Sequence, residues 1–295
     1  MERSETMKDV ITVGLDGTPE SLSAARWAAQ EARLRNARLR LLHAWVMLAP
    51  EEAAHRVDEQ DQNYWPHRIM DEARAAVQAQ EPDLPLDEAL VTEDPLEALK
   101  SAAGESDLLV LGSRDLGPLS RYVLGETGLQ IVAQTETPVV LVRARQEAAA
   151  TERNADVVVG VSLHEPCEAL LAFAFHSAAH RGVTLRAVHG RHLPAHAYNR
   201  GGGVEPYAAE MTAKDAQGEL TEALRPWRER FPEVRVAERV ELESPASALL
   251  HGAEDAGLLI VGRRHKRRML AARIGHVVQA AVHHAPCAVA VVPHE

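Results

Sequence analysis

Two features in the first half of the chain have the residue types to bind a nucleotide. Asp16 follows the apolar run Val10–Leu15, and Gly112 and Gly125 flank a loop thirteen positions apart. A carboxylate can accept hydrogen bonds from ribose or base donors, while loop amides and a helix N-terminus can bind phosphates. A fold that brings these two features together would form a nucleotide site.

The second half carries a strongly basic loop at the matching place. Arg263-Arg-His-Lys-Arg-Arg268 lies between Gly262 and Gly275. Two interpretations stay open. Charge runs are commonly solvated surface loops, but arginines can also make bidentate contacts to phosphate. This loop is the best candidate in the second half for contact with a polyphosphate or an acidic partner.

Other reactive residues form no recognisable catalytic or metal pattern. His189, His192 and His196 span a strand end and a proline-containing loop, so no regular face presents them together and we predict no metal site. Asp16 and Glu126 could form a general acid–base pair, but Asp16 is placed for binding rather than for activating a water molecule. We therefore expect no catalytic residues and no defined turnover.

The elements that must position these residues occur twice. Leu108–Arg114 reappears as Leu258–Arg264, 150 residues later, and a second glycine follows thirteen positions after the first in each copy. A repeat of this length is a duplicated domain, because solenoid units are about 20–50 residues long. We place the first domain at 1–146 and the second at 152–295.

Each half alternates strands and helices. In the first half we predict strands at Val10–Leu15, 38–46, 86–92, Leu108–Leu111 and Pro138–Val142, and helices at Thr18–Asn36, about 58–80, Pro95–Gly104 and from near Gly125. Continuously apolar strands indicate an α/β fold with a parallel sheet covered on both faces. With five strands in the order 3-2-1-4-5, ligands bind where the order reverses, between strands 1 and 4. Asp16 and Gly112 follow these two strands.

Charge and composition exclude several function classes. Residues 1–150 hold 15 Lys and Arg against 26 Asp and Glu, while residues 151–295 hold 17 of each. An acidic first half argues against nucleic-acid binding, which needs a basic face. No apolar run approaches the roughly 20 residues of a membrane span, and no signal-peptide core is evident. Cys167 and Cys287 fit reduced thiols, so we expect a soluble cytoplasmic protein without a membrane partner.

Several segments match a known family in the right order: Val13–Ser21, Leu42–Trp45, Glu93–Pro95, Leu108–Arg143 and Val282–Val289. Together they resemble the universal stress protein family in its tandem-domain form, a far more specific signal than one glycine pattern. The resemblance implies two flavodoxin-like (adenine nucleotide alpha hydrolase-like) domains. It also implies pairing through the final strands, Pro138–Val142 and Ala288–Val292, and we expect a homodimer.

ATP-binding members of this family carry Gly-x-x-Gly, nine residues and then Gly-Ser/Thr, so the resemblance implies ATP, with Mg²⁺, as the cofactors to consider. The motif and the switch point together give these candidates in the first domain: Gly14, Asp16, Gly17, Ala44, Gly112, Ser113, Arg114, Gly125, Glu126 and Thr127. In the second domain they give a weaker nucleotide or anion site: Gly160, Gly262, Arg263, Arg264, Gly275 and His276.

The chain departs from this motif at several positions. Asp115 stands where the second glycine belongs, Glu126 where the hydroxyl belongs, and Ser162 stands opposite Asp16 in the second half. Two like charges about 4 Å apart repel by roughly 4 kcal/mol at an effective dielectric of 20, and Glu126 can satisfy helix amides that would otherwise bind an anion.

Three hypotheses therefore stay open. The first is a stress-response binding protein that holds ATP chiefly in domain 1. The second is a non-nucleotide interaction protein with degenerate phosphate loops. The third is a slow ATPase or nucleotide-dependent switch.

Overall fold

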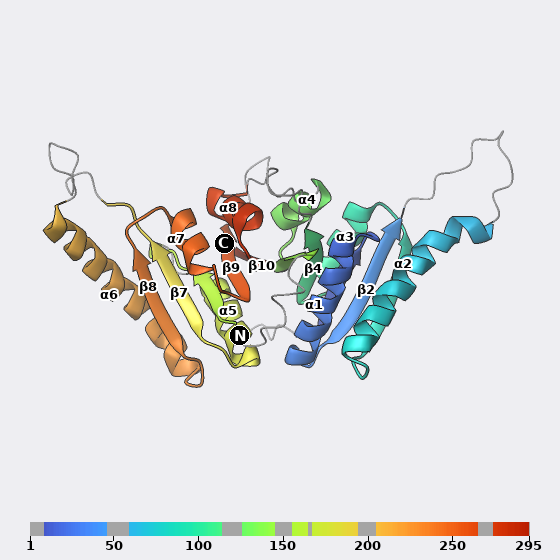
Figure 1. Cartoon of the computed structure of the whole chain (residues 1–295), viewed down its shortest axis with the longest axis horizontal. Helices are drawn as coiled ribbons and strands as arrows, with labels where there is room; N and C mark the ends of the chain where they lie inside the picture. The colour runs from blue at the N-terminus through green and yellow to red at the C-terminus, as the bar shows by residue number, and fades with distance from the viewer. Residues whose placement is uncertain are drawn as a thin grey trace, which may run out of the picture. The chain divides into compact units, whose positions relative to one another are not determined.

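The chain divides into two compact units, residues 1–148 and 149–295 (Figure 1). The computed structural model describes residues 9–45, 59–113, 126–144, 155–164, 167–193, 205–264 and 274–294. Each unit consists of a parallel β-sheet with helices packed on both of its faces.

Unit 1 alternates strands and helices as the sequence predicts. Its elements are β1 (Val10–Leu15), α1 (Pro19–Arg35), β2 (Arg38–Trp45), α2 (Glu59–Gln80), β3 (Leu86–Thr92), α3 (Pro95–Gly104), β4 (Leu108–Ser113), α4 (Glu126–Gln134) and β5 (Val139–Arg143). The ends agree with the prediction to within two residues, and the largest shift is in β4, which continues to Ser113 because it stays paired with β5 up to Arg143.

Unit 2 repeats the same succession. Its elements are β6 (Val157–Gly160), α5 (Glu168–Arg181), β7 (Leu185–Gly190), α6 (Pro206–Arg230), β8 (Val236–Glu241), α7 (Pro245–Gly252), β9 (Leu258–Arg264), α8 (His276–His284) and β10 (Ala288–His294). The sequence analysis assigned Arg263 and Arg264 to the basic loop, and this was wrong. Both residues extend β9, because β10 runs on to His294 and pairs with them.

The strand order is β3-β2-β1-β4-β5 in unit 1 and β8-β7-β6-β9-β10 in unit 2. All these neighbours within a unit are parallel. The predicted order 3-2-1-4-5 is confirmed in both units. The point at which the order reverses therefore lies between β1 and β4 in unit 1, and between β6 and β9 in unit 2.

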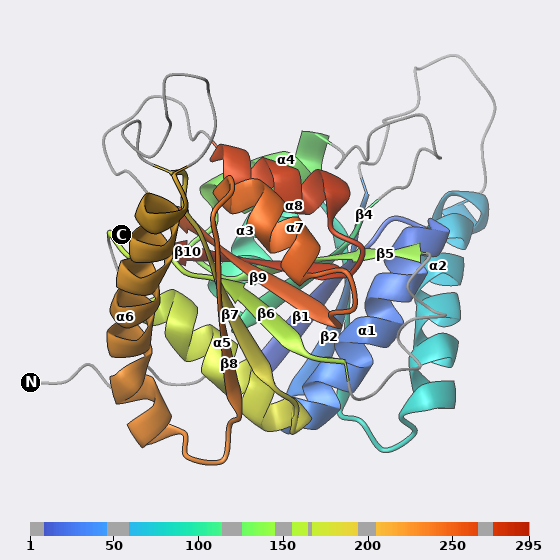
Figure 2. The same cartoon turned by 60° about the vertical axis from the view of Figure 1, so that its left-hand side comes forward.

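Pairs of helices cover each face of each sheet (Figure 2). In unit 1, α1 and α2 pack together over one face, while α3 and α4 pack together over the other. In unit 2, α5 and α6 cover one face of the sheet, and α7 and α8 cover the other. Both sets of side chains on the central strands are therefore buried, and β4, β5, β9 and β10 are buried along most of their length.

Three helices, α1, α3 and α7, start at a side-chain cap followed by a proline. Thr18 accepts a hydrogen bond from the Ser21 amide (3.2 Å), and Pro19 is the first residue of α1. Asp94 with Pro95 and Ser244 with Pro245 start α3 and α7 in the same way. Helix α5 differs, because its N-cap is Cys167, whose sulfur accepts a weak hydrogen bond from the Leu170 amide (3.4 Å).

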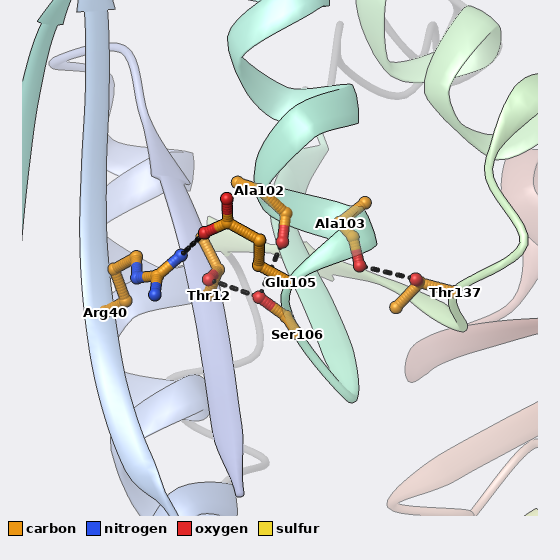
Figure 3. A network of polar contacts seen from close by, with 7 residues as sticks. All are labelled: Thr12, Arg40, Ala102, Ala103, Glu105, Ser106 and Thr137. Atoms are coloured by element: carbon orange, nitrogen blue, oxygen red, sulfur yellow. Dashed lines mark hydrogen bonds and ion pairs between the residues drawn. The ribbon is translucent and has the colours of Figure 1, made fainter. Parts of the chain in front are cut away.

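A polar network, buried at the Thr12–Ser106 pair, fixes the C-terminal end of α3 in unit 1 (Figure 3). The hydroxyls of Thr12 and Ser106 lie 2.7 Å apart, and Ser106 also donates to the carbonyl of Ala102 (2.7 Å). Nearby, Arg40 binds Glu105 (2.8 Å) and Thr137 donates to Ala103 (2.6 Å). These contacts join α3 to β1, β2 and the segment that leads into β5.

Unit 2 keeps only part of this network. Arg186 and Asp255 (2.7 Å) repeat the Arg40–Glu105 ion pair, and Arg186 holds the pKa of Asp255 below its usual value. The buried hydroxyl pair is replaced as a pair, since Val158 and Ala256 occupy the positions of Thr12 and Ser106. Replacing both partners avoids an unsatisfied buried hydroxyl.

Candidate functional site

The carboxyl ends of β1 and β4 lie side by side in unit 1. Gly14 of β1 is in register with Leu111 of β4, so Asp16 and Ser113 follow at the same edge of the sheet. The structure therefore brings together the two features that the sequence singled out. Asp16 is exposed at this edge, and Gly17 beside it has a φ of 77°, a left-handed conformation that favours glycine.

The Asp16 carboxylate is oriented by the residue that caps α1. Its Oδ1 accepts hydrogen bonds from the amide of Thr18 (3.0 Å) and from the Thr18 hydroxyl (2.5 Å). The same hydroxyl oxygen accepts from Ser21 in the first turn of α1. Because α1 is anchored in the core by buried alanines, Asp16 is held at the switch point by a packed helix.

In each unit a buried histidine ties the end of the second strand to the end of the first strand, a role that the sequence analysis did not assign. His43 Nδ1 donates to the carbonyl of Leu15, and His189 Nδ1 donates to the carbonyl of Val161, both at 2.8 Å. The signal in the sequence was the recurrence of histidine at the second strand of both copies. These bonds fix the strand end that precedes Asp16 in unit 1 and Ser162 in unit 2.

The glycines at the strand ends are explained by helix packing. A Cβ on Gly112 would lie 2.6 Å from backbone atoms of Glu20 and Ser21 in α1. A Cβ on Gly14 would lie 2.8 Å and 2.9 Å from the side chains of Leu111 and Leu99. Glycine at position 112 is therefore required by the fold whether or not a ligand binds, whereas a side chain at position 14 would need Leu99 and Leu111 to shift.

The phosphate side of the candidate site is described in part. Ser113 is buried, and no hydrogen-bond partner of its hydroxyl lies in the described part of the chain. Glu126 is the first residue of α4, and Thr127 behind it is exposed. Arg114, Asp115 and Gly125 lie outside the described residues.

The corresponding place in unit 2 has a different chemistry. Ser162 is exposed where unit 1 has Asp16, so the carboxylate is missing. Arg263 is buried and Arg264 is exposed at the end of β9. Gly275 is the N-cap of α8 without a side-chain hydrogen bond, and His276 begins that helix. The rest of the basic loop, residues 265–273, lies outside the described residues.

The two units also differ where β2 and β7 end. Gly190 of β7 packs so closely on α7 that a Cβ would lie 2.7 Å from Pro245. Unit 1 has Ala44 at the equivalent position, with Pro95 as the counterpart of Pro245. Gly160 resembles Gly14, since its missing Cβ makes room for Leu249 (2.8 Å), the counterpart of Leu99. In unit 2, β7 and α7 therefore approach each other so closely that only glycine fits at the end of the strand.

Metal ligation and thiol chemistry find little support in the described residues. His189 is buried, His192 is exposed, and His196 lies outside the described part. Within the described ranges, no group of three or more His, Cys, Asp or Glu side chains could hold a metal ion. Burial raises the pKa of the Cys167 thiol, the opposite of what activates a nucleophilic cysteine.

Comparison with known proteins identifies the family. Residues 7–143 and 154–293 each match the model of the Universal stress protein family. A universal stress protein of Mycolicibacterium smegmatis is 30% identical over 269 residues, which cover 85% of this chain and 86% of the relative. A universal stress protein of Mycobacterium tuberculosis is 29% identical over 282 residues, or 92% and 93% of the two chains.

Solved structures agree on the fold. A universal stress protein from Archaeoglobus fulgidus superimposes with a TM-score of 0.69 at 13% identity, covering 98% of this chain and 99% of that one. One from Pseudomonas aeruginosa gives a TM-score of 0.61 at 14% identity, covering 97% and 93%. None of the helices in the described residues is long and apolar enough to cross a membrane.

Proposed function

The chain belongs to the universal stress protein family, and on this premise we propose that it is a cytoplasmic stress-response protein that binds an adenine nucleotide in unit 1. The site is the switch point at the carboxyl ends of β1 and β4. The observation that carries the proposal is the exposed Asp16 carboxylate, which Thr18 orients beside the end of β4. We name ATP as the ligand, with Mg²⁺ as the ion that would accompany it.

Each part of this site suits one part of a nucleotide. Asp16 accepts hydrogen bonds from ribose hydroxyls, as charged acceptors at this edge of a doubly wound sheet do. The hydroxyl of Ser113, which has no partner among the described residues, and the first amides of α4 would bind the phosphates. We expect Gly14 and Ala44 to wall the adenine base. Unit 2 is the weaker site, because Ser162 replaces the carboxylate and Gly190 closes on α7.

An interaction protein without a nucleotide is the second candidate. The observation that favours it is the packing of Gly112 on α1, because this glycine is needed even in a protein that binds no phosphate. Asp115 and Glu126 put negative charge at the two motif positions where ATP-binding members have a glycine and a hydroxyl. Under this alternative the units serve as surfaces for pairing with other proteins. A third candidate is a nucleotide-dependent switch, in which the bound ATP would be slowly hydrolysed. We propose no enzyme of defined turnover and no nucleic-acid or membrane partner.

Copurification separates these candidates. The full chain is purified without added nucleotide, denatured, and the released small molecules are identified by mass spectrometry together with the ratio of absorbance at 260 and 280 nm. Binding predicts adenine nucleotide near one equivalent per chain, from unit 1. Nucleotide-free protein that also fails to take up ATP would support the interaction protein. Conversion of the bound ATP to ADP over hours would support the switch.

A further inference from the structure

Two histidines lie one helical turn apart on an exposed face of α5. His176 and His180 are four residues apart, their ring centroids are 6.0 Å apart, and their planes are inclined by 38°. Residues at this spacing are neighbours on the same helix face. Two adjacent imidazoles on one face can bind a metal ion together, and the proposed nucleotide site in unit 1 uses neither of them.

The surroundings of α5 hold this pair in place. Leu171, Phe175 and Ala178 anchor the opposite face of the helix in the core, where each is at most 2% exposed. The ring of His176 packs edge-on against Phe231, with centroids 4.9 Å apart. Ligands that a packed helix already positions lose less conformational entropy on binding than ligands on a free loop.

We infer that His176 and His180 form a surface site for a divalent transition-metal ion of the class that prefers imidazole ligands, represented by Cu²⁺ and Zn²⁺. Imidazole nitrogen suits these ions, whereas Mg²⁺ and Ca²⁺ prefer oxygen. Water completes the coordination, since the described residues offer no group of three or more His, Cys, Asp or Glu side chains at one place. Of the histidines that the sequence analysis weighed as metal ligands, His189 lies on β7 and His192 follows it, so the α5 pair is a separate site.

Some of the nearby charges favour the binding of a metal ion and others oppose it. His180 lies in the last turn of α5, where the partial negative charge of the helix C-terminus favours a cation. Arg181 donates to the carbonyl of Ser177 (3.2 Å), and Arg230 lies over the ring of Phe231 (5.6 Å), so two positive charges lie near the site. We therefore expect a reversible site that is weaker than a complete four-ligand site.

The repeat supplies an internal comparison. The positions in α1 that correspond to His176 and His180 are Gln30 and Leu34, neither of which is a metal ligand of this class. The chain also contains a matched control in α8. His283 and His284 have ring centroids 6.3 Å apart, a similar separation, but adjacent residues do not face each other on a helix.

Titration of the full chain with Cu²⁺ tests the inference by calorimetry, with electron paramagnetic resonance to count nitrogen ligands. The variants are His176→Gln/His180→Gln and the control His283→Gln/His284→Gln. Glutamine is a good helix former, and circular dichroism checks that each variant is folded. The first equivalent of Cu²⁺ should carry two nitrogen ligands in the wild type. Its affinity should fall by about tenfold or more in the α5 variant, because the second imidazole then no longer acts at high effective concentration.

The α8 control should bind the first equivalent as the wild type does, and His180→Gln alone should leave one nitrogen ligand fewer. Unchanged affinity and an unchanged spectrum in the α5 variant would overturn the inference. A loss in the α8 control equal to that in the α5 variant would overturn it as well. Displacement of Cu²⁺ by an equal concentration of Mg²⁺ would contradict the assignment to imidazole ligands.

Discussion

At the scale of single residues, the hydroxyls of Thr12 and Ser106 form a pair whose partners depend on each other. Ser106→Ala leaves the fully buried Thr12 hydroxyl without its partner and should destabilise the protein by about 1–3 kcal/mol, whereas Thr12→Val removes one hydrogen bond worth about 1 kcal/mol. The double variant should cost less than the sum, because Val158 and Ala256 already form the same apolar pair in unit 2. Urea denaturation of the four proteins measures this coupling. Strictly additive losses would show that the pair does not act as a unit.

Glu126 allows a test of the phosphate end at the same scale. This residue begins α4, at the place where the family motif has a hydroxyl. Glu126→Ser removes a negative charge that would repel a phosphate, so ATP should bind more tightly, by up to about 4 kcal/mol if the two charges lie about 4 Å apart. Glu136→Ser is the control, since it removes the same charge from an exposed residue just beyond the other end of α4. Weaker ATP binding in Glu126→Ser, measured by calorimetry, would instead make Glu126 a ligand, with Mg²⁺ between it and the phosphates.

At the scale of elements, α5 has the weakest side-chain cap of the capped helices that follow strands in the described residues. Thr18, Asp94 and Ser244 cap through oxygen, whereas Cys167 caps through sulfur. Cys167→Asp should stabilise unit 2 by about 0.5–1 kcal/mol, because an oxygen acceptor and a negative charge both suit a helix N-terminus. Thermal melting measures the gain. Cys287→Asp is the contrasting variant, since Cys287 is buried and a charge there should destabilise the protein. An unchanged or lower melting temperature in Cys167→Asp would show that the sulfur caps α5 at least as well as a carboxylate does.

The positions of the helices and strands could be predicted from the sequence, but several contacts between them could not. Apolar runs and Thr-Pro, Asp-Pro and Ser-Pro starts report burial and capping along the chain, so the strand positions and helix starts could be predicted. The packing of Gly112 on the backbone of α1 could not, because it depends on how closely two elements approach in space. The bonds of His43 and His189 to strand ends depend on the same approach. The extension of β9 through Arg263 depends on the length of its partner β10, which a run of basic residues does not report.

At the scale of the whole molecule, the final strands raise the question of what covers their second edge. Within unit 1, β5 pairs with β4 alone, and within unit 2, β10 pairs with β9 alone. Open edges of apolar strands promote unwanted association. Pairing of these edges, with another strand of the chain or of a second copy, therefore stays a prediction, as does the homodimer. Hydrogen exchange tests it: the amides of β5 and β10 should be as strongly protected as those of β4. Fast exchange at alternate positions, as in an open edge, would show that the edges are free.

The central claim, that unit 1 binds an adenine nucleotide through Asp16, is tested most directly by calorimetric titration of ATP into the full chain and two variants. Asp16→Asn keeps an oxygen to accept from Thr18 but removes the charge, and Ser162→Ala changes the equivalent position of unit 2. The account predicts that the wild type and Ser162→Ala bind ATP equally well, while Asp16→Asn binds about ten- to a hundredfold more weakly, the loss of a charge-assisted hydrogen bond worth about 1.5–3 kcal/mol. Equal affinity in Asp16→Asn and the wild type, or no heat of binding in the wild type, would contradict it.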